Sequence, residues 1–436
     1  MHFKPVFCPG LLLVLFTSRL LSQDVQYSKS VISELCSPGM HGRGYVNNGD
    51  SIAAAFIATE FAKSNISSLT KGYYQAFNIP VNTFHGRISC KIDKRQLIPG
   101  KEFILSPKSP GIDGEYKICS LTPANLSSTG KLSRWLKKSS QKVIFIDKRI
   151  IQNKPDSVKK NLDKLILSLS NMESAGPAAI LVSSTEKLTW STATSVSQRP
   201  IIYTNFLPVG RIKKTRLIID QKFIPAYKTQ NVIGMIPAKH QNDSLIVITA
   251  HYDHLGQMGR ETYFPGANDN ASGVALLLDL AKELSAIRDS LYYSVIFIAF
   301  SGEEAGLLGS RFFIENPAFN LHRIRFLINL DLAGTGDEGI TVVNATVFTK
   351  EFSLLNQIND RRNLLPAIKS RGEACNSDHC FFYKEGVPCF FIYTMGGIKA
   401  YHDIYDRPET LLLTAYNNYF VLLKRFILAL GYKPTN

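Results

Sequence analysis

The second half of the chain alternates apolar, strand-like runs with helical patterns, and this alternation constrains the fold more than any other feature of the sequence. Continuous apolar runs of strand length are typical of a mostly parallel sheet whose two faces are covered by helices. We therefore predict an α/β fold in which a mostly parallel mixed sheet is sandwiched by helices. The runs are SLIVITAHYD (244–253), ASGVALLLDLAKEL (271–284), SVIFIAFSG (294–302), FLINLDLAG (326–334), VPCFFIYT (387–394) and LLLTAYNNYFVLLKRFILAL (411–430).

The middle of the chain differs in composition and in the length of its apolar runs. Residues 85–225 hold short β-rich runs at 142–148, 178–183 and 199–205, separated by stretches rich in Ser, Thr and Lys. We predict that they form an inserted, smaller α+β domain. The main domain then consists of an N-terminal part, residues 23–84, and a larger part, residues 226–436. A chain of 436 residues is long enough for two to three domains.

The N-terminal part of the main domain contains an Ala-rich pattern, SIAAAFIATEFAK (51–63), preceded by turn residues. The spacing of its apolar residues is typical of an amphipathic helix. Asp is a favoured residue at the position just before a helix. We therefore predict a helix that starts near Asp50, with Asp50 as its N-cap.

Residues 1–22 combine a charged start, an apolar stretch from Val6 to Phe16 and a polar continuation. This arrangement is typical of a secretory signal peptide, and it predicts an exported protein (periplasmic, cell-envelope or extracellular) with no integral membrane segment after cleavage. No later run reaches the roughly 20 apolar residues that a membrane-spanning helix needs. A buried N-terminal helix is the alternative interpretation, because Pro9 and Gly10 interrupt the apolar stretch.

Cysteine usage adds a second feature that depends on the compartment. Six of the seven cysteines lie beyond the predicted signal peptide, and an oxidising compartment permits disulfides among them. Cys375 and Cys380 are five residues apart in a loop-like stretch, so they could close a small ring. Free buried thiols are the alternative.

The chain is strongly basic, since Lys and Arg exceed Asp and Glu by 50 − 35 = 15. An excess of this sign suits an acidic partner such as nucleic acid or an anionic envelope surface. The basic residues are scattered, however, and their clusters are as short as Lys137-Lys138 and Lys213-Lys214. We therefore predict a solvated basic surface and no nucleic-acid partner.

Residues of metal-ligating type recur at the ends of the predicted strands and in the turns that follow them. In open α/β sheets, functional groups gather just beyond the carboxyl ends of strands. Four carboxylates placed together repel one another strongly unless cations neutralise them, so the set predicts a metal site. Imidazoles and carboxylates suit Zn²⁺, and a bridging carboxylate allows two ions about 3.5–4 Å apart. Taken singly, each residue is more often a surface, capping or turn residue. The set is His251, Asp269, Glu303, Glu304, Asp331 and His402.

Six motifs follow one another in the order HYDHLG, PGANDNASGVA, FSGEEAGLLGS, NLDLAG, SDHCFFYKEGVP and YHDIYDRPET. In this order they resemble the M28 family of zinc metallopeptidases, of the secreted aminopeptidase type. The resemblance covers residues 229–432, and GRGYVNNGDS (42–51) is similar to the family's leading segment. Residues 85–225 resemble, on a few short runs, the protease-associated domain that is often inserted in these enzymes.

The resemblance implies a fold of the zinc-exopeptidase type and an exported, zinc-dependent exopeptidase. It implies an aminopeptidase that hydrolyses the N-terminal bonds of peptide substrates by a metal-bound hydroxide. Glu303 matches the family's general base, and Tyr401 matches a position that hydrogen-bonds the oxyanion in some relatives. Asp253 matches a carboxylate that orients a ligand imidazole, and the bond between Asp269 and Asn270 matches a cis peptide. Two zinc ions are implied, with Asp269 bridging both, His251 and Asp331 on one, and Glu304 and His402 on the other.

Three other functions stay open at this point. One is a carboxypeptidase or dipeptidase of the same fold, whose pocket binds a free carboxylate through an arginine such as Arg371. In an aminopeptidase, carboxylates such as Glu303 and Asp331 bind a free ammonium instead. A glutaminyl cyclotransferase works on one zinc ion, and a receptor-like binding protein lacks ligands, so the complete ligand set argues against both. Leu332-Ala333 and Asp403 depart from the family's usual residues, which leaves the shape and charge of the substrate pocket, the substrate-binding residues and the oligomeric state open.

Overall fold

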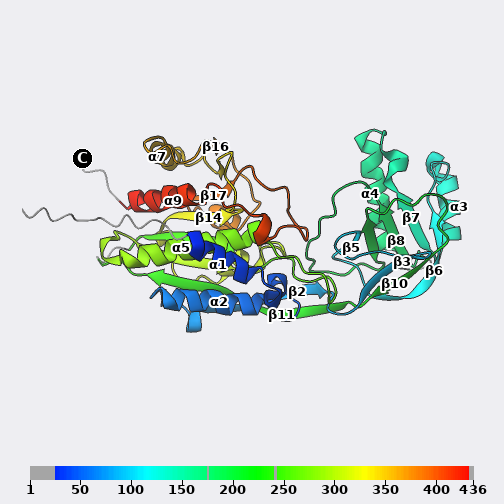
Figure 1. Ribbon diagram of the computed structural model, residues 1–436, viewed down its shortest axis with the longest axis horizontal. Coiled ribbons are helices and arrows are strands. Elements are labelled where there is room, and N and C mark those ends of the chain that lie inside the picture. Colours follow the sequence, from blue (N-terminus) through cyan, green and yellow to red (C-terminus); the bar gives the residue numbers. More distant parts are fainter. Residues whose placement is uncertain (1–24, 174–175, 240–242, 432–436) are drawn as a thin grey trace, which may run out of the picture.

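The computed structural model describes residues 25–173, 176–239 and 243–431, which form two units, each built on its own β-sheet (Figure 1). The first unit holds a nine-stranded sheet, and the second holds an eight-stranded sheet made of β3 to β10. Two long antiparallel strands, β2 (Tyr74–Thr83) and β11 (Lys222–Ile236), run between the units. The predicted signal peptide, residues 1–22, lies outside the described residues. None of the described helices combines the length and apolar character needed to span a membrane.

The sheet of the first unit is mixed, with parallel strands at its centre. Strands β13, β12, β14 and β17 are parallel neighbours in that order, whereas β11 and β15 pair antiparallel on either side of them. The predicted mostly parallel mixed sheet is confirmed. In order across the sheet the strands are β1 (Ser67–Ser68), β11, β13 (Ser294–Phe300), β12 (Leu245–His251), β14 (Ile324–Asp331), β17 (Cys389–Thr394), β15 (Ile340–Val343) and β16 (Ile368–Ser370), with β2 paired to β11.

Successive residues of the central strands pack into hydrophobic cores on opposite faces, as the pleat of a strand requires. In β13, Phe297 belongs to the core that includes α1, α2, α5 and α9, whereas Ile298 belongs to the core that includes α6 and α8. Helices thus cover both faces, which explains why the strands are continuous apolar runs. The helices are α1 (Val25–Leu35), α2 (Gly49–Lys63), α5 (Ser272–Ala286), α6 (Leu308–Glu315), α7 (Thr349–Asp360), α8 (His379–Lys384) and α9 (Tyr416–Leu430).

Helix α2 starts two residues earlier than an N-cap at Asp50 implies, because the N-cap is a different residue. Asn48 occupies the N-cap position in the left-handed conformation, with φ 58° and ψ 30°. The predicted N-cap, Asp50, lies inside the helix and is buried. Its carboxylate accepts hydrogen bonds from the hydroxyls of Tyr227, at 2.6 Å, and Thr229, at 2.7 Å, on β11. The N-cap prediction for Asp50 was therefore wrong, because these tertiary partners draw the carboxylate into the core.

The second unit is inserted at the far end of the β2–β11 ribbon, so the chain enters it after Thr83 and leaves it before Lys222. Strands β6 to β9 are parallel, and α3 (Thr129–Ser139) and α4 (Asp156–Ser170) pack against β7 and β8. The short runs predicted from the sequence form β7, β8 and β9. The strands are β3 (Ile88–Ile92), β4 (Arg95–Gln96), β5 (Phe103–Leu105), β6 (Ile112–Ser120), β7 (Val143–Asp147), β8 (Ala179–Ser183), β9 (Ile201–Thr204) and β10 (Lys214–Ile219).

The two units are also joined by packing. Leu255, Met258 and Phe264, from the loop between β12 and α5 of the first unit, are buried in a core that contains side chains of the second unit. The metal-ligand candidates described below lie around this loop. The second unit therefore packs against the part of the first unit that carries the site.

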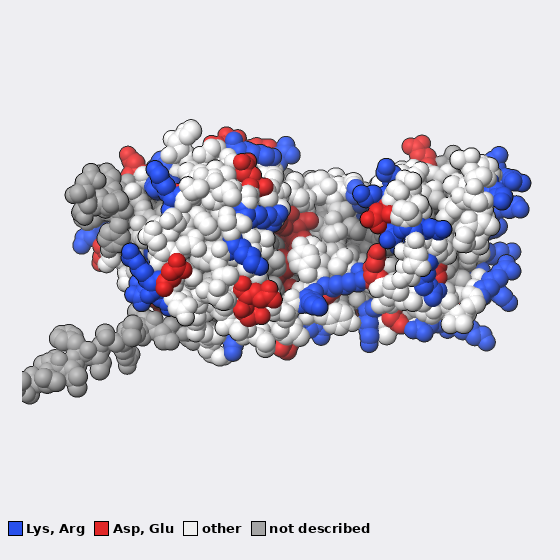
Figure 2. All heavy atoms as spheres, turned by 90° about the horizontal axis from the view of Figure 1, so that it is seen from above, with Lys and Arg blue, Asp and Glu red and all other residues white. Residues whose placement is uncertain are grey.

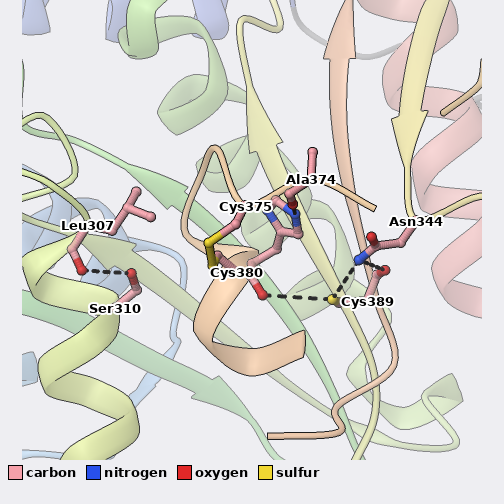
Figure 3. The surroundings of a disulfide bond; sticks show 8 residues. Leu307, Ser310, Asn344, Ala374, Cys375, Cys380 and Cys389 are labelled. Carbon is pink, nitrogen blue, oxygen red and sulfur yellow. Dashed lines mark hydrogen bonds between the residues drawn. A yellow bond between two sulfur atoms is a disulfide. The ribbon is translucent and has the colours of Figure 1, made fainter. Parts of the chain in front are cut away.

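One disulfide is present among the described cysteines. Cys375 is bonded to Cys380 at the start of α8 (Figure 3), which settles the alternative left open by their spacing. The remaining described cysteines are free: Cys36, Cys90, Cys119 and Cys389.

Candidate metal centre

The six predicted metal-site residues converge at the carboxyl edge of the parallel strands, where they line one cavity of about 320 Å³. His251 and Asp331 are the last residues of β12 and β14, which are neighbours in the sheet. Loops at the same edge supply the rest: Glu303 and Glu304 after β13, Asp269 before α5, and His402 after β17.

The carboxylate of Asp269 lies between two imidazoles. Its Oδ1 is 3.4 Å from Nε2 of His251, and its Oδ2 is 3.1 Å from Nε2 of His402. Each imidazole also faces a second carboxylate at 3.4 Å, His251 that of Asp331 and His402 that of Glu304. Ligands about 2.0–2.2 Å from a tetrahedral zinc ion lie about 3.3–3.6 Å from one another. The spacing therefore fits two adjacent metal positions that share Asp269.

His254 is a site residue that the sequence reasoning missed, although it stands in the motif HYDHLG. Its side chain is buried, and its Nδ1 lies 2.8 Å from Oε1 of Glu304. His254 is also close enough to Asp269 and Glu304 to be a metal ligand itself. However, His402 faces both carboxylates from the cavity, whereas His254 contacts Glu304 through Nδ1.

Asp253 connects the ends of β12 and β13. Its carboxylate accepts hydrogen bonds from the backbone N–H groups of Glu303, at 3.2 Å, and Glu304, at 3.3 Å, and from the phenol of Tyr45, at 2.8 Å. Nδ1 of His251 is 3.1 Å from the backbone oxygen of Asp253 and 3.8 Å from its carboxylate. The carbonyl is thus the nearer partner of the imidazole, and the role predicted for the carboxylate of Asp253 stays a prediction.

The loop that carries Asp269 is held from two sides. The carboxylate of Asp406 accepts hydrogen bonds from the backbone N–H groups of Asn268, at 2.8 Å, and Asp269, at 3.0 Å. The fully buried guanidinium of Arg43 donates to three carbonyl oxygens of residues 265–269 at 2.6–3.3 Å. The peptide bond after Asp269 is cis, as the resemblance implies. The sequence alone assigned no role to Arg43 or Asp406, although Arg43 stands in GRGYVNNGDS and Asp406 in YHDIYDRPET.

Burial and neighbouring charges set the protonation of the site. Burial disfavours the charged form of Asp269, but hydrogen bonds with His251 and His402 hold its pKa well below the usual range. Burial likewise disfavours a charged imidazole at His402, but Glu304 and Asp269 raise its pKa to about 11. Burial raises the pKa of Glu303 well above that of a free glutamate, and the carboxylate of Glu304 acts in the same direction. A raised carboxyl pKa is what proton transfer near neutral pH requires.

An aromatic ring and two apolar side chains form part of the remaining wall of the cavity. Tyr401 stacks on the imidazole of His402, with 4.0 Å between the ring centroids. Burial and the nearby carboxylates raise the pKa of Tyr401, so its phenol keeps its proton. Leu307 and Leu332 also line the cavity. Figure 2 shows acidic side chains in the hollow between the two units, whereas Lys and Arg side chains are spread over the outer surface.

Comparison with known proteins places this site in a family. Residues 231–427 match the family model described as peptidase family M28. The chain contains an M28 peptidase domain. Aminopeptidase YwaD of Bacillus subtilis (strain 168) is 29% identical over 252 residues, which are 55% of this chain and 50% of that protein. A probable zinc metalloprotease of Pyricularia oryzae is 34% identical over 116 residues, 26% of this chain and 23% of that protein. The chain thus spans half or less of the length of these curated relatives.

Solved structures resemble the chain over both units, and not only over the M28 domain. A zinc aminopeptidase from Bacillus subtilis superposes with a TM-score of 0.67 at 19% identity, over 94% of this chain and 95% of that one. A peptidase M28 precursor from Shewanella amazonensis has a TM-score of 0.67 at 14% identity, over 95% of both chains. The α/β fold of the zinc-exopeptidase type, predicted from the resemblance, is therefore confirmed.

Proposed function

We propose that this chain is an exported, zinc-dependent exopeptidase that acts as an aminopeptidase and hydrolyses N-terminal peptide bonds. The observation that carries the proposal is the carboxylate of Asp269, which lies between the imidazoles of His251 and His402. The M28 domain supports it, as do the names of two relatives, an aminopeptidase and a probable zinc metalloprotease. Export rests on the signal-like pattern of residues 1–22.

The donor set fits zinc, because imidazole nitrogens and carboxylate oxygens are ligands that this ion accepts in low coordination. We assign His251 and Asp331 to one ion, Glu304 and His402 to a second, and Asp269 to both. Zinc, when bound, supplies a Lewis acid that polarises a carbonyl and lowers the pKa of water to about 7. We refer below to the position between Glu304 and His402 as the second metal position.

Glu303 is placed to take the proton of the attacking water. One of its carboxylate oxygens lies within 4.8 Å of the ligand atoms of His251 and Asp331, and its backbone is held by Asp253. Its carboxylate can accept a proton from the attacking water and then pass it to the leaving amine. The phenol of Tyr401, at the cavity wall, can donate a hydrogen bond to the oxygen of the scissile carbonyl.

The cavity favours a free ammonium over a free carboxylate as the group that it recognises. Among the described residues that line the cavity, the charged or titratable ones are carboxylic acids, histidines and a tyrosine, with no Lys or Arg. Recognition of a substrate carboxylate relies on a cation, most effectively arginine. The candidate Arg371 lies outside the lining and donates instead to the phenol of Tyr393 at 3.2 Å. The site thus supports the aminopeptidase rather than the carboxypeptidase alternative.

The proposal is tested by zinc content and substrate selectivity. Zinc per purified chain is measured alongside hydrolysis of aminoacyl-anilides and N-blocked peptides, before and after chelation. We expect about two zinc ions and chelator-sensitive release from free N-termini only, because a blocked amine cannot pair with the carboxylates of the cavity. Hydrolysis from the carboxyl end would select the carboxypeptidase alternative. One zinc ion without such release would favour the cyclotransferase, and absence of both metal and activity would favour a binding protein.

A further inference from the structure

A segment of the second unit reaches the metal centre. Residues 187–192 lie in the connection between β8 and β9, and in Figure 1 the chain after β8 runs from the second unit back toward the first. Within this segment, Ser191 lines the same cavity as the metal-ligand candidates. Its neighbours Lys187, Trp190 and Thr192 make polar contacts with the loops that carry Glu304 and His402, which no sequence motif predicted.

Lys187 holds the loop around His402. Its Nζ is 2.7 Å from Oδ2 of Asp403, and it donates to the backbone oxygens of Lys399, at 2.8 Å, and Tyr401, at 3.0 Å. The side chain of Asp403 is only 5% exposed, so this ion pair is partly shielded from water. Asp403 departs from the family's usual residue and adds a negative charge directly after His402 in the sequence. In the structure, an ammonium from the second unit pairs with that charge.

Trp190 and Thr192 donate hydrogen bonds to the backbone of the two assigned ligands, His402 and Glu304. The backbone N–H of Trp190 donates to the carbonyl oxygen of His402 at 2.8 Å. The hydroxyl of Thr192 donates to the carbonyl oxygen of Glu304 at 2.5 Å. The indole of Trp190 is buried and stacks on Phe264 of the first unit, with 4.7 Å between the ring centroids. The segment is therefore seated on the first unit rather than lying loosely over it.

We propose that residues 187–192 form a positioning clamp for the second metal position and supply one wall of the substrate cavity through Ser191. This inference rests on the proposed function, because it assigns a task toward the zinc ion held by Glu304 and His402. Lys187, Trp190 and Thr192 are positioning residues, since they act on the ligands through the backbone. The second unit is then part of the catalytic machinery and not merely a cover over the cavity.

The two metal positions should depend on the clamp to different degrees. His251 and Asp331 are strand residues, fixed by their ladder pairings with β13 and β17 in the first sheet. Glu304 and His402 are loop residues, and the clamp contacts both loops. Because loss of a group that orients a metal ligand typically costs about 10–100-fold in metal affinity, a loosened loop should weaken one position and spare the other. A general loss of stability would affect both positions.

The test measures release of zinc from the loaded full-length protein into excess chromophoric chelator, with two release phases expected for the wild type. The phase that disappears in His402→Gln identifies the second metal position. We expect Lys187→Met and Thr192→Val each to accelerate that phase about tenfold and to leave the other unchanged. Lys187→Arg should restore the wild-type rate, because its guanidinium can pair with Asp403. In a Trp135→Phe background, acrylamide quenching of the remaining tryptophan, Trp190, reports whether the segment is seated.

The matched control is Lys214→Met, which removes an ammonium that pairs with Glu115 within the second unit at 3.0 Å. It should leave both release phases, kcat and KM unchanged, whereas the clamp variants should lower kcat as well. Unchanged zinc release in Lys187→Met and Thr192→Val would overturn the clamp, as would equal acceleration of both phases. If the wild type itself binds no zinc and hydrolyses no peptide, the proposed function fails instead. The quenching of Trp190 then still reports whether the segment is seated.

Discussion

Replacement of Arg43 by methionine tests how the loop of Asp269 is held. The guanidinium of Arg43 is fully buried and donates to five carbonyl oxygens at 2.6–3.3 Å: those of Leu35, Tyr252, Pro265, Gly266 and Asp269. Methionine fills a similar volume but leaves these acceptors without their donor. A buried acceptor left unsatisfied costs about 1–3 kcal/mol. The oxygen of Gly266 keeps a second donor, the N–H of Ala271 at 3.2 Å, so four acceptors lose the donor that Arg43 supplied. At about 1 kcal/mol each they cost about 4 kcal/mol, and part of that is offset because a buried charge is no longer desolvated.

We therefore expect Arg43→Met to lower the free energy of unfolding by about 3–4 kcal/mol. The assay is urea unfolding of the chelated protein followed by far-ultraviolet circular dichroism, so that bound metal does not mask the loss. Arg43→Lys should fall between, because an ammonium has only three donors. The control is Arg325→Met, since the exposed Arg325 pairs with Glu351 at 3.4 Å and an exposed pair contributes about 0–1 kcal/mol. An effect of Arg43→Met no larger than that of the control would refute the reasoning.

Three further predictions follow from the site and its surroundings. Glu303→Ala should keep the zinc content of the wild type and lower kcat by a factor of about 10²–10⁴, measured on an aminoacyl-anilide, and retained turnover would remove Glu303 from the mechanism. Burial raises the pKa of Asp50 to about 6, so the folded state holds this proton more tightly than the unfolded state, and stability should fall by about 3 kcal/mol as the pH rises from about 4 to above 6. In Asp50→Asn, the free energy of unfolding should change less with pH across this range. A pH dependence equal to that of the wild type would contradict the assignment. Removal of zinc by a chelator should lower the melting temperature, and zinc at a free concentration of 1,000 Kd should restore about 4 kcal/mol, whereas a melting temperature that does not respond to zinc would count against the metal centre.

Much of the fold could be predicted because its main determinants are local. Strand β12 (Leu245–His251) and strand β13 (Ser294–Phe300) are buried on both faces, so each is a continuous apolar run that is visible without any knowledge of the tertiary structure. The assigned ligands were visible for the same reason, since His251 ends β12 and Asp331 ends β14. A strand end is a position that hydrophobic patterning locates well.

The residues that escaped prediction act over long distances in sequence. His254 contacts Glu304 from 50 residues away, and Lys187 donates a hydrogen bond to the backbone of Tyr401 from 214 residues away. Asp50 has the residue type of an N-cap and lies next to the start of a helix, yet its partners are 177 and 179 residues away on β11. Local propensity cannot anticipate such contacts, because they exist only after the sheet has brought the loops together.

The sequence by itself determined which side chains could bind metal and at which edge of the sheet they would gather. Only the tertiary structure decided which carboxylate oxygen faces which imidazole, with Oδ1 of Asp269 toward His251 and Oδ2 toward His402. It also decided that the charge of Asp403 is paired with Lys187 of the second unit. The physical reason is that residue type and hydrophobic period are properties of the chain, whereas coordination geometry and charge compensation depend on distances of about 3 Å between segments that only the folded core brings together.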